Sequence, residues 1–126
     1  MKNTKTPLRR VRGLGSSHSG TGHFWYERVT AVALIPLTLW FAWAVLGLVN
    51  TSPVVVIGFL SRPLNALMMA GFAIVALYHV RLGLQVVIDD YVHKPGAKIA
   101  LILLVRFSVI ATGAVCLFAL MRIANF

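Results

Sequence analysis

Acidic residues and cysteines are scarce in this chain of 126 residues. Three Asp and Glu residues stand against twelve Lys and Arg residues, and the formal net charge is +9. The single cysteine, Cys116, excludes an internal disulfide. It cannot hold an iron–sulfur cluster alone either, because such clusters usually take four thiolates. Cys116 lies in an apolar stretch, so we expect it to serve in packing only.

Charged residues of either sign are also few. They make up 12% of the chain, whereas hydrophobic residues make up 59% and the mean hydropathy is +0.84. A soluble domain is about half apolar, so this excess indicates a membrane protein. The length favours one short domain. Little of the chain remains outside the apolar segments to build a soluble enzyme core.

The basic residues are concentrated before the first apolar run. No aromatic-interleaved basic groove accompanies them, so we predict no nucleic-acid partner. A basic arm that sets membrane topology accounts for them better. Six of the twelve lie in this arm: Lys2, Lys5, Arg9, Arg10, Arg12 and Arg28.

Three long apolar runs predict an all-α integral membrane protein with three transmembrane helices. Each run reaches the roughly 20 residues that a helix needs to span the hydrocarbon core. Helix is required because lipid offers no hydrogen-bond partners to the backbone. Pro36 in the first run predicts a kink. The spans are expected at about 29–49, 64–88 and 99–121, with residues 1–28 as a basic cytoplasmic arm with an interfacial segment and 29–126 as the membrane anchor.

The first run is expected to be retained as a span and not cleaved. Ala42-Trp43-Ala44 and Arg9-Arg10 have the character of a cleavage site and a twin-arginine signal. However, the apolar run continues beyond Ala44 and two further spans follow. The glycine- and serine-rich stretch 16–22 predicts a flexible connection between the arm and the membrane.

Two proline-containing segments predict helix starts after a capping residue. They are Ser52-Pro53 and Ser61-Arg62-Pro63. The apolar piece 54–60 between them is too short to span a bilayer. We expect it to lie along the outer interface.

The flanking charges predict the orientation. Connection 50–63 carries only Arg62, and connection 89–98 carries Lys94 and Lys98, whereas the arm carries six basic residues. By the positive-inside rule the N-terminus is cytoplasmic and the C-terminus periplasmic. The second connection then lies at the inner, cytoplasmic end.

His79 is the only histidine inside a predicted span. It lies about nine residues, or roughly 14 Å, from the inner end of the second helix. An ionisable side chain at that depth is usually functional or paired. Three roles stay open: a haem ligand, a proton relay, and a neutral imidazole hydrogen-bonded to a neighbouring helix. His18 and His23 are assigned to the arm and His93 to the inner surface, so a bis-histidine haem needs another subunit.

Asp90 and Tyr91 lie at the inner end of the same helix. Asp90 follows His79 by eleven residues, which is about 20° around the helix and roughly 16 Å along it. Gly83 falls near the same face and offers room for a flat macrocycle or another helix. This arrangement suits a haem in the membrane below a quinone at its rim, with Tyr91 as a phenolic donor. The alternative is a helix end in the headgroup layer.

Three arginines close to or within the spans have separate expectations. Arg28 opens the first span and could meet a haem propionate, Asp90 or a lipid phosphate, or could simply set topology. Arg81 and Arg106 lie about 10 Å inside the inner end, where arginines snorkel. Because Arg81 is about 200° around the helix from His79, we assign it to snorkelling or an interhelical contact.

The run from His79 to Val92 (HVRLGLQVVIDDYV) resembles the H-x10-D-Y pattern of the smaller hydrophobic membrane anchor subunits of succinate dehydrogenase (respiratory complex II). Gly83 and Gln85 resemble that family's bacterial members. The Arg-x-Thr-Ala segment at 28–31 resembles the entry to the family's first span. Three spans and the length also fit.

The resemblance implies specific roles. His79 is expected to be an axial ligand of haem b, opposite a histidine from a second three-helix anchor (the cytochrome b subunit). Asp90 and Tyr91 are expected at the ubiquinone site, and Arg28 near the haem propionates. The expected partners are an iron–sulfur subunit and an FAD-containing flavoprotein, in the bacterial cytoplasmic membrane. Electrons from succinate oxidation in the flavoprotein would reach quinone here, while this chain does not oxidise succinate itself.

Other functions remain open from the sequence. A non-redox transporter could use His79 and Asp90 as proton-relay groups. A structural membrane anchor could dock a soluble partner through the basic arm. A quinol:fumarate reductase anchor would run the reaction in the opposite direction.

Overall fold

The computed structural model describes residues 6–11 and 20–125. Within these residues there are five helices and no strand. Of the arm, residues 1–28, the structure describes Thr6, the short helix α1 (Pro7–Val11) and residues 20–28, which belong to the next helix. The other helices are α2 (Gly20–Leu48), α3 (Pro53–Leu60), α4 (Pro63–Tyr91) and α5 (Pro95–Ala124).

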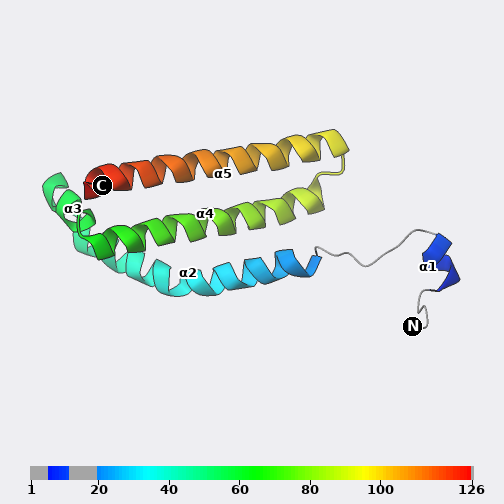
Figure 1. Cartoon of the computed structure of the whole chain (residues 1–126), viewed down its shortest axis with the longest axis horizontal. Coiled ribbons are helices and arrows are strands. Elements are labelled where there is room, and N and C mark those ends of the chain that lie inside the picture. The colour runs from blue at the N-terminus through cyan, green and yellow to red at the C-terminus, as the bar shows by residue number, and fades with distance from the viewer. Residues whose placement is uncertain (1–5, 12–19, 126) are drawn as a thin grey trace.

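Three of the helices are long and apolar enough to cross a membrane, so the predicted all-α architecture is confirmed. Helices α2 and α4 contain 29 residues each and α5 contains 30. At 1.5 Å per residue each is about 45 Å long, which exceeds the hydrocarbon core. Each long helix runs antiparallel to the one before it, and α4 contacts both α2 and α5 (Figure 1). The start of α2, the end of α4 and the start of α5 therefore share one end, called here the α4–α5 end.

Helix α2 starts at Gly20, earlier than the span expected from Val29. Of the stretch 16–22 predicted to be flexible, residues 16–19 lie outside the described residues, and Gly20 to Gly22 form the first turn of α2. The prediction is wrong for these three residues. The cost of glycine in a helix is only about 1 kcal/mol each. Tertiary packing offsets it, since the Tyr26 ring meets Tyr78 of α4 edge-on at 6.4 Å between centroids.

Proline occupies the first turn of α3, α4 and α5, where its missing N–H removes no hydrogen bond. Ser52 precedes α3 as predicted, although its side chain makes no capping hydrogen bond. The prediction that Ser61 caps α4 is wrong, because Arg62 holds the N-cap position. The Ser61 hydroxyl instead lies 2.8 Å from the carbonyl oxygen of Ile57 and 3.0 Å from that of Ile123. It therefore ties the end of α3 to the end of α5.

Pro36 lies inside α2, and the helix curves beyond its middle toward α3 (Figure 1). Past the proline, stacked rings hold α2 against its neighbours. Phe41 stacks on Phe72 of α4 at 4.4 Å between centroids. Trp40 stacks on Phe59 of α3 at 6.4 Å. The bend is therefore supported by contacts at both α4 and α3.

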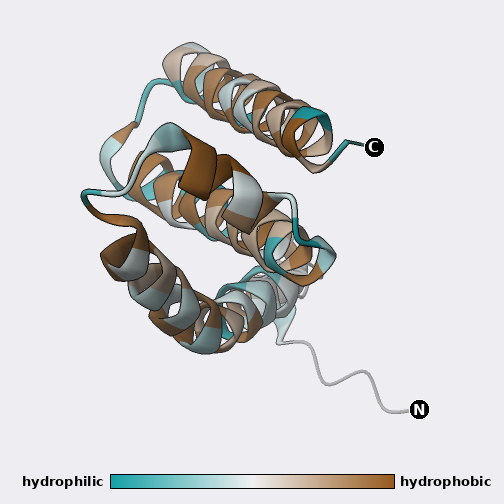
Figure 2. Ribbon diagram, turned by 90° about the vertical axis from the view of Figure 1, so that its left-hand side faces the viewer, coloured by the Kyte–Doolittle hydropathy of each residue, from teal (hydrophilic) through white to brown (hydrophobic). Residues whose placement is uncertain are grey.

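The chain builds almost no core of its own. Among the described residues only Thr30, Ala44, Leu82 and Ile88 are buried. Hydrophobic residues occur on every side of the long helices, as the brown segments of Figure 2 show. A helix that is apolar all round is covered by lipid or by other protein. The three-helix unit thus has its free apolar surface facing outward.

Candidate functional site

His79 of α4 meets Thr30 of α2 at the contact between the two helices. The Nδ1 atom of His79 lies 2.8 Å from the Thr30 hydroxyl oxygen. That oxygen also lies 2.8 Å from the carbonyl of Tyr26 and 3.0 Å from the carbonyl of Glu27. Thr30 is only 9% exposed. The Arg-x-Thr-Ala segment at 28–31 stood out in the sequence as a family resemblance, but no role of Thr30 itself was indicated.

The number of protons in this cluster selects the histidine tautomer. A threonine hydroxyl has one proton, and in a helix it commonly donates that proton to a carbonyl three or four residues earlier. The Thr30 oxygen then accepts a hydrogen bond from Nδ1–H of His79. The opposite tautomer would place a proton on Nε2, for which no described residue is an acceptor. Nε2 is therefore assigned as the unprotonated nitrogen, with a free lone pair.

The surroundings of His79 leave room for a ligand. One of the three predicted roles, a hydrogen bond to a neighbouring helix, is present at Nδ1, and it leaves Nε2 without a described partner. A Cβ atom added at Gly83, one turn further along, would meet nothing within 4 Å. An imidazole with a free Nε2 beside an open glycine flank fits a haem iron and a flat macrocycle. In the described part of the chain, no group of three or more His, Cys, Asp or Glu gathers to hold a bare metal ion.

The adjacent carboxylates at the end of α4 have different surroundings. Asp89 forms an ion pair with Lys98 of α5, at 2.7 Å between Oδ1 and Nζ. Asp90 is exposed and forms no ion pair or hydrogen bond within the described residues. Consecutive helical residues point about 100° apart, so one carboxylate faces α5 while the other does not. Asp89 joins two helices, whereas Asp90 pairs with no described residue.

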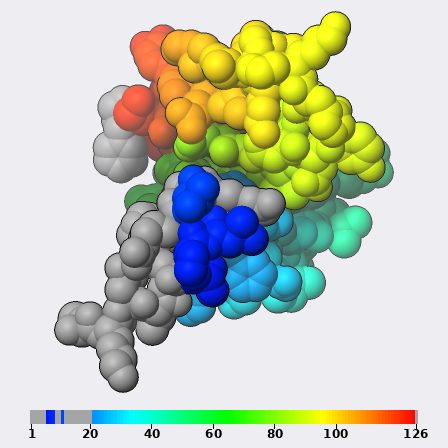
Figure 3. Space-filling model, turned by 90° about the vertical axis from the view of Figure 1, so that its right-hand side faces the viewer, coloured from blue at the N-terminus to red at the C-terminus, as the bar shows by residue number. Residues whose placement is uncertain are grey.

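Tyr91 is the last residue of α4 and is 79% exposed. Helix α4 is continuous from His79 to Tyr91. The angle of about 20° expected between His79 and Asp90 therefore holds for this segment. Tyr91 itself is twelve residues from His79, about 18 Å along the axis. Figure 3 looks at this end of the molecule, where the end of α4 and the start of α5 are open surface. The candidate site therefore has two parts. His79 lies within the candidate membrane span, and Asp90 and Tyr91 lie at its end.

Histidines outside the spans differ from expectation at one position. His23 belongs to α2 and not to the arm, and its Nε2 is buried without a hydrogen-bond partner. It lies seven residues before Thr30, two turns away and about 20° around the helix. His18 lies outside the described residues, and His93 is exposed after α4. His23 therefore places an unpaired ring nitrogen near the face of α2 that carries Thr30.

Arg28 lies on the side of α2 away from α4. It is about 200° around the helix from Thr30, and its guanidinium lies 5.0 Å from the centre of the Phe24 ring. Arg28 is exposed. No described acid pairs with it, so it is available to an anion on the outer side of α2.

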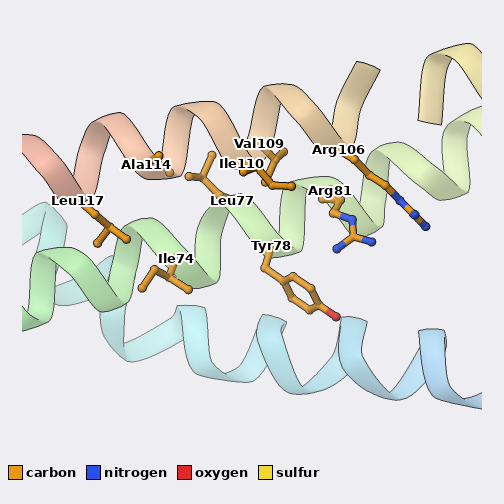
Figure 4. Close-up of a pocket in the computed structure, with 10 residues that line it drawn as sticks. Ile74, Leu77, Tyr78, Arg81, Arg106, Val109, Ile110, Ala114 and Leu117 are labelled. Carbon is orange, nitrogen blue, oxygen red and sulfur yellow. The ribbon is translucent and has the colours of Figure 1, made fainter. Parts of the chain in front are cut away.

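Arg81 and Arg106 line a cavity of about 600 Å³ between α4 and α5 (Figure 4). The Arg81 guanidinium lies 5.7 Å from the centre of the Tyr78 ring on its own helix. No contact between Arg81 and His79 is found among the described residues. The sequence did not predict this cavity. Apart from the two arginines, its walls are mostly apolar residues of two helices and form no recognisable motif.

Comparison with known proteins gives a consistent family. Residues 2–115 match the family described as succinate dehydrogenase/fumarate reductase transmembrane subunit. The chain is 38% identical over 120 residues to the succinate dehydrogenase hydrophobic membrane anchor subunit of Paracoccus denitrificans, covering 95% of this chain and 90% of that one. It is 34% identical over 103 residues to the protein of the same description from Rickettsia bellii, covering 82% of each chain. The succinate dehydrogenase membrane anchor subunit of Reclinomonas americana is 33% identical over 91 residues, covering 70% of this chain and 76% of that one. No solved structure gives a significant match.

Proposed function

The chain belongs to the succinate dehydrogenase/fumarate reductase transmembrane subunit family, and from this premise we propose that it is the hydrophobic membrane anchor of a succinate:quinone oxidoreductase. In this role it binds haem b through His79 together with a second three-helix anchor. It forms part of the ubiquinone site with Asp90 and Tyr91. It docks an iron–sulfur subunit and a flavoprotein at the α4–α5 end, which faces the cytoplasm of the bacterium.

The hydrogen bond between Thr30 and His79 is the observation that carries this proposal. It satisfies Nδ1 at 2.8 Å and leaves Nε2 as an electron-pair donor within a membrane span. Metal-bound histidines usually donate their other N–H to a neighbouring oxygen, which fixes the tautomer and the ring orientation. The α2–α4 contact has this arrangement.

Haem b, when bound, supplies a one-electron carrier within the membrane. The residues of this chain would hold the imidazole through Thr30 and leave space beside Gly83. Among the described residues, His23 lies in the first turns of α2 and His93 follows the end of α4, so neither is inside the spans expected from the sequence. A second histidine ligand would therefore come from the second anchor.

The exposed acid and phenol at the rim suit a quinone. Reduction of a quinone to a quinol takes up two electrons and two protons. The Tyr91 hydroxyl can donate a hydrogen bond to a quinone carbonyl, and the free Asp90 carboxylate can pass protons from the aqueous side. Arg28 remains assigned to the haem propionates or their vicinity. It is exposed and has no acidic partner among the described residues.

The α4–α5 end also suits the soluble partners. It carries the exposed His93 and Lys94, and Lys98 pairs with Asp89 there. The basic arm leads into the start of α2 at this same end. By the positive-inside rule, the end that carries the arm is expected to face the cytoplasm. The flavoprotein oxidises succinate, and the iron–sulfur subunit passes electrons to the quinone beside Tyr91. The contribution of this chain is binding, orientation and electrostatics.

A quinol:fumarate reductase is the second candidate, because the family description includes both enzymes. Family membership speaks against the non-redox transporter. The decisive experiment is to purify the chain with its native partners, identify them, and record reduced-minus-oxidised spectra. We expect a flavoprotein, an iron–sulfur protein, a second anchor and a b-type haem. An assembly with neither haem nor flavoprotein contradicts the proposal.

A further inference from the structure

The hydroxyl of Thr30 on α2 forms a hydrogen bond with Nδ1 of His79 on α4. We propose that Thr30 is a positioning residue that sets the tautomer and electron donation of His79. The inference rests on the proposed function, because it concerns His79 as a haem ligand. Among the described residues, the Thr30–His79 bond is the only side-chain hydrogen bond found between α2 and α4.

The hydroxyl and the helix carbonyls form a short chain of hydrogen bonds. Thr30 donates to the carbonyl of Tyr26 or Glu27, and its oxygen accepts from Nδ1–H of His79. Such a chain polarises the imidazole and makes Nε2 a stronger donor. Stronger donation favours ferric over ferrous iron. Thr30 therefore lowers the haem midpoint potential and prevents rotation of the ring.

Two substitutions at Thr30 separate the hydroxyl from the methyl group. Thr30→Val keeps the volume and removes the hydroxyl, whereas Thr30→Ser keeps the hydroxyl. In the purified complex, we expect Thr30→Val to raise the midpoint potential and to lower haem affinity about tenfold or more. We expect Thr30→Ser to retain the wild-type potential and spectrum. The amount of assembled complex and its thermal unfolding serve as controls for folding.

The outcomes also separate this inference from the proposed function. If His79→Ala loses haem while Thr30→Val keeps wild-type haem content, potential and electron paramagnetic resonance signal, only the role of Thr30 is overturned. If His79→Ala itself keeps the haem spectrum, the proposed ligand is wrong and this role of Thr30 is wrong with it. Equal shifts in Thr30→Val and Thr30→Ser also overturn the inference, because the hydroxyl is then not the cause.

The cavity between α4 and α5 carries a separate inference. Its two arginines, Arg81 and Arg106, also line a second, smaller gap between the same helices. The remaining walls of the cavity are mostly apolar, with Tyr78 beside Arg81 as Figure 4 shows. They include Ile74, Leu77, Val109, Ile110 and Leu117.

The two guanidinium groups have no counter-charge from the described residues. Asp89, the acid of α4 on this side, is paired with Lys98. The Nε atom of Arg81 is buried and has no hydrogen-bond partner. Unpaired positive charge beside an apolar cavity in a membrane span is costly. A bound anion removes that cost.

The cavity opens on the flank of α4 opposite the proposed cofactor sites. Measured around the helix from His79, Gly83 and Tyr91 lie about 40° and 120° in one direction. Tyr78 and Arg81 lie about 100° and 160° in the other direction. The haem and the quinone are proposed on the first flank. The second flank is therefore not occupied by the proposed cofactors.

We infer that this cavity binds one anionic phospholipid. Its phosphate lies between Arg81 and Arg106, and one acyl chain lies along the apolar walls. The arginines are about 10 Å inside the predicted end of the spans, from which their side chains reach toward the headgroup layer. Arginine pairs readily with phosphate through parallel N–H donors. The combination of two unpaired arginines with an apolar channel matches the two parts of a phospholipid.

The test measures lipid bound to the purified complex by native mass spectrometry. We expect wild-type complex to retain an anionic phospholipid, and Arg81→Gln/Arg106→Gln to bind it at least tenfold more weakly. Arg62→Gln/Arg122→Gln, at the opposite end of the spans, is the matched control and should retain it. After delipidation, vesicles of phosphatidylglycerol should restore thermal stability to wild type but not to the double variant, and phosphatidylcholine should restore neither.

Two outcomes overturn the lipid site. One is equal retention of anionic lipid by Arg81→Gln/Arg106→Gln and by the control. The other is a protein occupant, detected as a cross-link from a cysteine placed at Ala114, which lines the cavity, to another subunit. Neither outcome depends on haem or quinone, so the lipid site and the proposed function fail separately.

Discussion

Helix α4 makes two contacts of different kinds with its neighbours. Against α2 it forms a polar and aromatic contact, with the Thr30–His79 hydrogen bond and the stacked Phe41 and Phe72 rings. Against α5 it leaves an apolar cavity, and the Asp89–Lys98 ion pair closes only the end. Directional contacts fix the rotation of a helix, whereas apolar contacts tolerate small shifts. The α2 contact is therefore the one that suits the cofactor ligand we propose.

The largest expected effect is at His79. We expect His79→Ala to lose the proposed axial bond and with it the b-type haem spectrum of the purified complex. His93→Ala is the matched control, because His93 is an exposed histidine beyond the end of α4. Difference spectra of the two variants provide the measurement. An unchanged Soret band in His79→Ala would remove His79 as a ligand and weaken the distinction between the two contacts.

Tyr91→Phe tests the rim of the proposed site. Removing the phenolic donor should lower succinate:quinone reductase activity about 100-fold. Succinate oxidation with an artificial dye should remain close to wild type, because the flavoprotein is untouched. Tyr26→Phe, at the α2–α4 contact, should retain both activities. Normal quinone reduction in Tyr91→Phe contradicts the quinone role.

Asp90→Asn and Asp89→Asn compare two adjacent carboxylates. Loss of the free Asp90 carboxylate should lower quinone reduction about tenfold, since water can take over part of its proton transfer. Loss of Asp89 breaks a partly exposed ion pair, for which we expect at most about 1 kcal/mol of stability and no change in activity. The assays are quinone reductase activity and thermal unfolding. The reverse ranking would show that Asp89 is the functional carboxylate.

The smallest expected effects come from enlarging one small side chain on α2 and one on α5, the two helices that α4 contacts. Ala44 is 3% exposed on the side of α2 that carries Thr30, so Ala44→Leu should cost about 1–3 kcal/mol through overpacking. At α5, a Cβ added to Gly113 would lie 3.5 Å from Leu77, an ordinary contact. Gly113→Ala should therefore stabilise the helix by up to about 1 kcal/mol. Thermal unfolding of the complex distinguishes them, and equal destabilisation contradicts the proposed difference in tolerance.

The spans were predictable from sequence, but their limits were not. The apolar runs correctly indicated three spanning helices. They missed the first turns of α2, because Gly20 to Gly22 read locally as a flexible segment while packing of Tyr26 on Tyr78 stabilises helix there. Ser61 was likewise misassigned as a cap, since its actual acceptor on Ile123 lies 62 residues away.

The candidate site was predictable along one helix and not across helices. The spacing of His79, Asp90 and Tyr91 is a property of a single helix, so their relative rotation follows from 100° per residue. The partner Thr30 is 49 residues from His79 in sequence. The hydrogen bonds of Thr30 to carbonyls of its own helix, and its burial, cannot be recognised from the sequence. The burial of the His23 ring nitrogen was missed for the same reason.

Sequence alone determined that this chain crosses a membrane three times and carries an imidazole within a span and an acid and a phenol at its rim. It did so because span length and helical periodicity depend only on neighbouring residues. Tertiary structure decided that Thr30 contacts His79 and that Lys98 pairs with Asp89, while Asp90 pairs with no residue that the structure describes. Helices that are apolar all round leave their mutual rotation and register unspecified by hydropathy, so only side-chain contacts between α2, α4 and α5 settle them.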